Sequence, residues 1–369
     1  MGKTNNNIEL KKNNLAFAAL NPYVTTNTVE NVEKEISGKD FIAWGTDNRY
    51  PNYLFSLYED CATLQSIING TVDFVCGNDI TCNLPIFEKT VNKNGDTILD
   101  IIQRISTDYL IFGGFSLQVI RNAVGNITEL YWVDFTKIRS DKKNEVFFYS
   151  DEWDKSYGRV KYIIYPKFNL DDSNPSSIFY YKGNKTRGTY PVPVYNAAIT
   201  SCELEKKINE FHLNEISNNF LTSKIINFNS GVPDDDLKNE IENSINEKFS
   251  GAENAGRILI SFNNNKDSET TVADIPQDEF GERYDSLAKR STSQIFTAFR
   301  ATPNLFGLPT ETTGFNQQEF AEAFKLYNRT AVKPIQKVIV DTFDKIFGVD
   351  GSITIEPFNL EYDSEQEVE

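Results

Sequence analysis

The first half of the chain shows two different hydrophobic periods. Apolar residues recur every three or four positions in three early segments, which predicts helices opening at Pro51 or Asn52, over 63–75, and from an N-cap at Asp96 to a Gly-Gly pair. After that pair, apolar and polar residues alternate in FSLQVIRN, ITELYWVDF, EVFFYS and RVKYIIYPKF, with turn residues between them. This half therefore predicts an antiparallel sheet packed on helices.

The second half predicts three long helices. The first covers about 196–220 and would be roughly 30 Å long, because an α-helix rises about 1.5 Å per residue. The second starts near Gln277, and the third starts at Gln317 and contains Pro334, which is able to kink it. Between the first two, the strand KIINF, a helix opening at Pro233 and the strand RILISF form a small βαβ-like insert.

The second and third long helices are separated by ATPNLFGLPTETTGFNQQ, residues 301–318. Its prolines remove backbone donors, its glycines permit tight turns, and its threonines give a neutral polar tip. The pattern indicates that one helix ends here and another begins, as an ordinary connection between helices would also require.

Length and charge narrow the class of protein. A chain of 369 residues is long for a single core and predicts two or three domains. The hydrophobic fraction of 39% is modest, which favours thin domains completed by neighbouring subunits, or alternatively a well-solvated, Asn-rich surface. The formal net charge of −16 argues against a tight DNA clamp, since such a surface repels phosphate. An acidic surface serves solubility, and it also suits a protein that lets DNA pass without sticking.

The sequence shows no signal for a cofactor, a metal site or a membrane span. The four cysteines form no CxxC pair and are expected to be buried thiols in a reducing compartment. Patterns for nucleotide binding, GxxxxGK[ST] and GxGxxG, are absent, as are a signal core and a long apolar run. The single histidine, His212, is expected to pack rather than to catalyse.

Acidic residues leave one enzymatic alternative open. Asp134 lies beside Trp132 and Glu152 beside Trp153, and a glycoside hydrolase needs two carboxylates in an aromatic cleft. The triplet Asp234, Asp235 and Asp236 resembles a metal site superficially, but it more simply serves the positive end of a helix. No catalytic residue is predicted.

Four segments together resemble the portal proteins of tailed double-stranded DNA bacteriophages. WGTDNRYPNYLFSLYEDCATLQSIINGTVDFVCG is similar to the family's N-terminal signature, and YPVPVYNAAITSCELEKKINEFHLNEISNNF to its entry into the first stem helix. KFSGAENAGRILISF looks like the end of the clip, and TPNLFGLP matches the Pro-x-Leu-Phe-Gly pattern before the tunnel loop. The resemblance covers about residues 41–347 in order.

The resemblance implies an α+β portal fold with an antiparallel-sheet wing, long stem helices, a small α/β clip and a tunnel loop. Few residues follow the last predicted wing helix, so a crown is expected to be minimal or absent. The implied divisions are an arm at 1–40, a wing at 41–195, stem helices at 196–221 and 277–300, a clip at 222–276, a tunnel loop at 301–316, a wing helix at 317–348 and an acidic tail at 349–369.

The resemblance also implies where DNA and the packaging motor would lie. The tunnel-loop residues expected to face DNA are Asn304, Gly307, Pro309, Thr310, Glu311, Thr312, Thr313, Gly314 and Phe315. The stem acids expected to line the channel are Glu203, Glu210, Asp278 and Glu282. The acids of the clip expected to face the terminase are Asp234, Asp235 and Asp236.

The implied assembly is a ring of twelve subunits at one capsid vertex, formed in the host cytoplasm. Its implied partners are the terminase large subunit, the major capsid protein and scaffold, a head-tail adaptor, and double-stranded DNA held without sequence specificity. No membrane and no cofactor is implied. The alternatives are a carboxylate-based soluble hydrolase or another head-tail connector.

Overall fold

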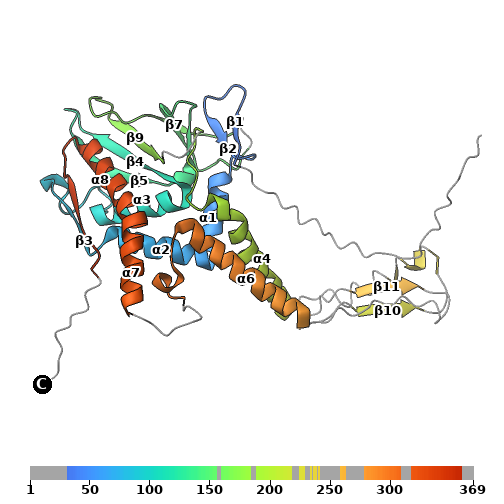
Figure 1. Ribbon diagram of the computed structural model, residues 1–369. Helices are drawn as coiled ribbons and strands as arrows, with labels where there is room; N and C mark the ends of the chain where they lie inside the picture. Colours follow the sequence, from blue (N-terminus) through green and yellow to red (C-terminus); the bar gives the residue numbers. More distant parts are fainter. Residues whose placement is uncertain are drawn as a thin grey trace, which may run out of the picture. The chain divides into compact units, whose positions relative to one another are not determined.

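The computed structural model describes residues 31–155, 159–183, 188–217, 224–228, 233–234, 236–238, 240–241, 258–262, 278–308 and 317–359 (Figure 1). The chain divides into two compact units. The larger is formed by residues 28–206 and 287–369, and the smaller includes residues 207–286. The wing, stem and clip boundaries given above stay predictions.

Helices cover one side of a sheet in the larger unit (Figure 1). Its helices are α1 (Tyr50–Asp60), α2 (Ala62–Cys76), α3 (Ile98–Phe112), α7 (Gln317–Tyr327) and α8 (Lys333–Phe347). One antiparallel sheet has the order β5-β4-β9, with β4 (Gly114–Arg121), β5 (Ile127–Val133) and β9 (Ser176–Lys182). A second has the order β6-β7-β8, with β6 (Ile138–Ser140), β7 (Val146–Tyr149) and β8 (Ile163–Pro166). The predicted antiparallel sheet packed on helices is confirmed, and β9 is a strand that the pattern did not reveal.

The ends of α3 show how local sequence sets the helix boundaries. The N-cap is Thr97, one residue beyond the predicted Asp96, because the Thr97 hydroxyl accepts from the backbone of Asp100 while the Asp100 carboxylate accepts from the backbone of Thr97. At the other end Gly113 has φ +83, a left-handed conformation that suits glycine. The helix therefore ends at the predicted Gly-Gly pair.

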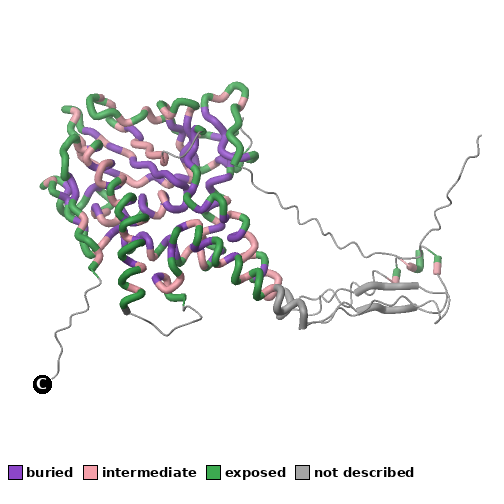
Figure 2. Tube along the Cα trace, viewed as in Figure 1, coloured by how far each residue is buried: buried purple, intermediate pink, exposed green. Residues whose placement is uncertain are grey.

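The core of the larger unit joins segments far apart in the sequence. Fully buried side chains from α1, α3 and α8, including Leu54, Ile101 and Phe343, belong to one cluster. Figure 2 colours the buried residues purple. The antiparallel pairing of β3 (Asp79–Cys82) with β12 (Ile353–Glu356) joins segments far apart in the sequence and attaches the last described segment to this core. The core is thus completed only when the end of the chain returns.

The predicted arm at 1–40 has structure where it is described. Glu33–Glu35 form strand β1, which pairs antiparallel with β2 (Ile42–Trp44). The carboxylate of Glu33 accepts hydrogen bonds of 2.8 Å from the backbone N–H groups of Thr189 and Tyr190. Residues 33–35 are therefore part of the fold, contrary to the expectation of an arm with little structure, because the carboxylate satisfies two backbone donors of a distant segment.

The third predicted long helix is interrupted. It consists of α7, a π-helical turn at Asn328–Val332, and α8. Pro334 lies in the first turn of α8, immediately after the π-helical turn. Proline cannot donate to the preceding turn, and the wider π turn accommodates its ring.

The smaller unit contains the predicted insert. Strands β10 (Lys224–Phe228) and β11 (Ile258–Phe262) pair in parallel, as a βαβ-like connection requires, and residues 236–238 and 240–241 are helical. The two long helices α4 (Ile199–Ser217) and α6 (Asp278–Phe299) are present as predicted, and each contributes residues to both units.

Candidate functional site at the base of the broken helix

The end of α6 is a Schellman motif built without glycine. The N–H of Ala301 donates to the carbonyl of Phe296 (3.0 Å), and the N–H of Arg300 donates to Thr297 (3.1 Å). Between these bonds Arg300 adopts φ +56, which costs a residue with a Cβ roughly 1 kcal/mol or more. Ala301 and Phe296 are both buried in the same hydrophobic cluster, where this motif normally places an apolar pair.

A second tight turn follows at once. Pro303–Phe306 form a 3-10 turn, and Gly307 ends it at φ +81. The N–H groups of Gly307 and Leu308 both return to the carbonyl of Pro303. Because Leu305 is buried, this turn is fixed to the larger unit rather than projecting from it.

Aromatic side chains clamp the turn from three helical segments. The ring of Phe306 lies 6.1 Å from Phe74 of α2, 6.0 Å from Phe296 of α6 and 5.6 Å from Tyr327 of α7, measured between ring centroids. Such separations are typical of favourable edge-on contacts. Gly70 lies beneath the ring, where a Cβ atom would approach it to 2.9 Å.

A buried pair of hydroxyl groups also joins α7 to α2. The Tyr327 hydroxyl lies 2.7 Å from the Thr71 hydroxyl, which also hydrogen-bonds to the carbonyl of Ile67 at 2.6 Å. Burial raises the pKa of Tyr327 to about 12. The neutral phenol therefore joins the end of α7 to α2, so that both helices that flank residues 309–316 are fixed to the same core.

The predicted DNA-facing loop thus has a defined base. Asn304 and Gly307 belong to that base, and Asn304 Oδ1 is buried without a hydrogen-bond partner in the described part of the chain. The other loop candidates lie outside the described residues: Pro309, Thr310, Glu311, Thr312, Thr313, Gly314 and Phe315. Their role stays a prediction, and the clamp was not visible in the sequence because its partners are distant along the chain.

The predicted channel acids of α4 have different surroundings. Glu203 accepts a 2.5 Å hydrogen bond from the Tyr53 hydroxyl, and it is half-buried. Its neighbour Glu205 accepts from the backbone N–H of Thr63 at the start of α2. Glu203 is therefore engaged inside the subunit, which leaves Glu210 as the better candidate for a channel wall.

Glu210 forms an exposed ion pair with Lys207, at 2.6 Å, one turn earlier on α4. Such a pair contributes little stability, but it partly neutralises the carboxylate. The side chains of the remaining candidates, Asp278 and Glu282, lie outside the described residues. His212 packs edge-on against Tyr284, at 5.6 Å between ring centroids, as expected of a packing residue.

Two of the three acids predicted to lie in the clip belong to the described residues. Asp234 is exposed, and its side chain accepts a 2.9 Å hydrogen bond from the backbone N–H of Leu237. Asp236 is exposed and helical, whereas Asp235 lies outside the described residues. Asp234 thus caps the short helix, which is the simpler of the two roles considered from the sequence.

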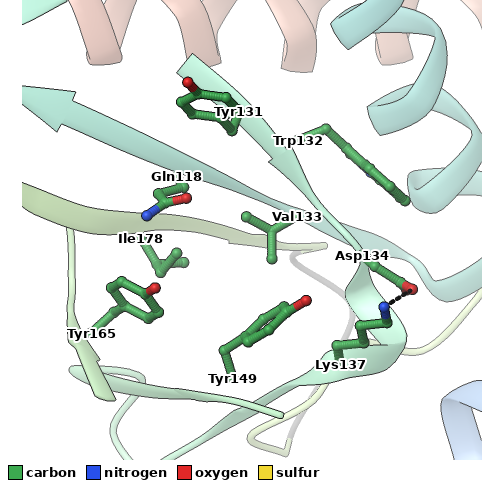
Figure 3. A pocket seen from close by; sticks show the side chains of 9 residues that line it. All are labelled: Gln118, Tyr131, Trp132, Val133, Asp134, Lys137, Tyr149, Tyr165 and Ile178. Carbon is green, nitrogen blue, oxygen red and sulfur yellow. Dashed lines mark ion pairs between the residues drawn. The ribbon is translucent and has the colours of Figure 1, made fainter. Parts of the chain in front are cut away.

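A cleft lies between the two antiparallel sheets beside Asp134, one of the acids adjacent to a tryptophan (Figure 3). It encloses about 360 Å³, and Tyr131, Tyr149 and Tyr165 surround it. Its lining includes one carboxylate, Asp134, whose oxygen lies 3.9 Å from Lys137 Nζ.

Glu152, the second acid considered for hydrolysis, lines a different pocket and pairs with Lys155 at 2.6 Å. The two carboxylates therefore do not share a cleft, as a glycosidase would need.

The remaining features considered from the sequence are the cysteines, metal ligands and membrane-spanning helices. Cys61, Cys76, Cys82 and Cys202 are free and buried, as expected, and burial raises the pKa of Cys76 to about 12. In the part of the chain that the structure describes, no cluster of three metal-ligating side chains occurs. Over the same residues, every helix is too short or too polar to span a bilayer.

Solved structures share this fold. The neck of a native GTA particle computed with C12 symmetry matches with a TM-score of 0.50, 17% identity, and coverage of 85% of this chain and 86% of the other. A crystal structure of an HK97-family phage portal protein from Corynebacterium diphtheriae matches with a TM-score of 0.50, 12% identity, and coverage of 82% and 95%. At such identities the likeness concerns the fold, which is that of a portal subunit.

The family follows from the sequence itself. Residues 88–365 match the family described as phage portal protein. The chain belongs to that family. No curated protein sequence is detectably similar to it. The resemblance stated from the sequence motifs is therefore confirmed.

Proposed function

We propose that copies of this chain close into a ring around an axial channel for double-stranded DNA at one capsid vertex, with twelve subunits. The single observation that carries this is the match to the portal family over 88–365. The similar neck structure has C12 symmetry, which supports the subunit number. In this arrangement DNA enters during packaging and leaves by the same channel during ejection.

The anchored base of the broken helix supports a loop that reaches toward DNA. Both ends of residues 309–316 are fixed, one by the buried turn at Leu305 and the other through Tyr327. A loop that extends from two fixed ends is carried by a rigid scaffold, as binding loops often are. Three threonines at that tip would touch DNA without a strong charge, so that the duplex can slide.

The proposed partners follow from the ring. A terminase large subunit would dock on the clip near Asp234, Asp235 and Asp236, and a head-tail adaptor would join once packaging ends. Major capsid protein and scaffold would surround the wing, and assembly would take place in the host cytoplasm. The formal charge of −16 per subunit supports a channel that repels phosphate and has no sequence specificity.

Electron microscopy of the purified assembly tests the proposal directly. Expressed alone or with its scaffold and capsid proteins, the chain should form particles with an axial hole and a mass many times 42.0 kDa. Only monomers in the presence of both partner proteins would overturn the ring. A ring that does not support packaging by a matching terminase would overturn the channel role while leaving the assembly in place.

A further inference from the structure

A row of basic side chains follows the exposed face of α7 and α8. Residues 325–337 contain four bases and no acid, and the bases occupy every fourth position: Lys325, Arg329, Lys333 and Lys337. All four are exposed, whereas Tyr327 and Ile335 between them are buried. This basic row is a local exception on a chain of net charge −16.

The π-helical turn at Asn328–Val332 keeps the basic row on one side of the helix. In a regular α-helix of 3.6 residues per turn, positions four apart move around the axis by about 40° at each step. A π-helical turn contains more residues, so it rotates the chain less per residue and reduces this drift. The buried side shows the same adjustment, since Tyr327 and Val332 are both buried five positions apart. The row therefore extends along one side for about 18 Å, at about 1.5 Å per residue.

The two central bases of the row have no acidic partner among the described residues. The outer two pair with acids at 3.8 and 3.1 Å: Lys325 with Glu322, and Lys337 with Asp341. In the part of the chain that the structure describes, Arg329 and Lys333 form no ion pair. Like charges four residues apart repel each other and weaken a helix, so an uninterrupted row of bases does not serve helix stability. It points instead to a negatively charged partner.

We propose that the basic row, with Arg329 and Lys333 at its centre, binds the phosphate backbone of double-stranded DNA without sequence specificity. This inference rests on the proposed function, because it gives the duplex a second contact beside the loop. Helix α7 begins at Gln317, directly after the residues proposed to touch DNA. Lys325 follows about 12 Å further along the helix, so the row starts close to that proposed contact.

Duplex DNA matches the basic row in charge and in length. Each DNA strand carries one negative charge per about 3.4 Å of its axis, so about 18 Å of helix spans about five phosphates of one strand. The net charge of −16 repels a duplex at long range. Within the Debye length of about 8 Å at physiological ionic strength, however, the nearest charges decide the interaction. The row therefore attracts the duplex locally, whereas the neutral tip proposed for the loop lets it slide.

Fluorescence anisotropy of a short labelled DNA duplex, measured with the full chain at several salt concentrations, tests this contact. Arg329→Gln with Lys333→Gln should weaken binding several-fold at low salt. It should also lower the salt slope of the affinity by about 2, since each phosphate contact contributes about 0.9. Lys89→Gln with Lys143→Gln removes the same charge at exposed positions elsewhere and should change neither value. Arg329→Lys with Lys333→Arg keeps both charges and should retain the slope of the parent.

Failure of this contact can be told apart from failure of the ring. A parent chain that binds no duplex at low salt, or equal losses in the two Gln variants, would overturn the contact. Loss of rings in the Arg329 and Lys333 variant alone, with unchanged duplex affinity, would assign the row to the neighbouring subunit instead. If no variant and no parent chain formed rings, the proposed ring would be wrong, and the duplex measurement on single subunits would still decide the row. Both Gln variants should melt within a few degrees of the parent, because all four positions are exposed.

Discussion

The ring of Phe306 covers Gly70 so closely that a Cβ atom there would lie 2.9 Å from ring carbons Cδ1 and Cε1. Glycine inside a helix usually costs about 0.5–1 kcal/mol relative to alanine. Here the absent side chain is what allows the turn at Pro303–Phe306 to dock on α2. Gly70 lowers the intrinsic stability of α2, but it makes room for the turn at Pro303–Phe306, which lies far along the chain.

Gly70→Ala should therefore fail to stabilise the protein, because the helix gain is offset by displacement of Phe306, and overpacking typically costs about 1–3 kcal/mol. The urea midpoint of unfolding should fall or stay unchanged. In the matched control Ser66→Ala, at an exposed position of the same helix, the midpoint should stay or rise slightly. Combining Gly70→Ala with Phe306→Leu should cost less than the sum of the single changes; strict additivity would show that the two residues do not touch.

Arg300→Gly should raise the urea midpoint. Glycine adopts the left-handed conformation at φ +56 without strain, which is worth about 1 kcal/mol at such a C-cap. Arg300→Ala removes the same side chain but keeps the Cβ, so it isolates the backbone effect. If the alanine variant gains as much as the glycine variant, the strain argument is wrong.

Asp108→Asn should stabilise the protein at neutral pH. Burial raises the pKa of Asp108 well above its ordinary value, although the indole N–H of Trp132 donates to it at 2.7 Å. When the pKa is higher in the folded state, the free energy of unfolding is greatest below the pKa of the unfolded state, near 3.9. It falls as the pH rises from there toward the pKa of the folded state. The melting temperature of the variant should exceed that of the parent at pH 7, and the difference should vanish near pH 4.

Asp100→Asn is the control of opposite sign on the same helix. Hydrogen bonds from the backbone and hydroxyl of Thr97 lower the pKa of Asp100, so its contribution is present above the unfolded pKa and is lost as the pH falls through the folded one. This variant should melt below the parent at pH 7 and converge with it in acid. Shifts of the same sign in both variants would contradict the assignment.

Deleting residues 309–314 should spare assembly and impair DNA packaging or retention. The turn at Pro303–Phe306 and the clamp at Tyr327 fix the loop ends without help from those residues. Ring formation is measured by electron microscopy and packaging by protection of DNA from nuclease. Replacing the segment by an equal length of Gly and Ser separates loop length from loop chemistry. Loss of folding after the deletion would make the segment structural.

Changing Asp234 to Ala should weaken the helical residues 236–238, because the N–H of Leu237 loses its acceptor at 2.9 Å. N-cap losses of this kind cost about 1 kcal/mol. Local hydrogen exchange at residues 236–238 measures the effect, and Asp236→Ala, which removes the neighbouring acid but keeps the bond from Leu237 to Asp234, is the comparison. Equal protection in both variants would show that Asp234 does not cap.

The sequence by itself determined the elements whose signals are local. The helices at α1, α2 and α3, the strands β4 and β5, and the parallel pair β10 and β11 follow from hydrophobic period, capping residues and glycines within a few positions. Four short motifs in order also sufficed to indicate the portal family.

Only the tertiary structure decided the contacts between distant segments. The pairing of β3 with β12, the strand at Glu33–Glu35, the engagement of Glu203 by Tyr53 and the clamp of Phe306 over Gly70 join residues far apart along the chain. Hydrophobic period shows which face of an element is buried, but not which other element buries it. That choice depends on burying apolar area and satisfying backbone donors over the whole core at once, which no local pattern encodes.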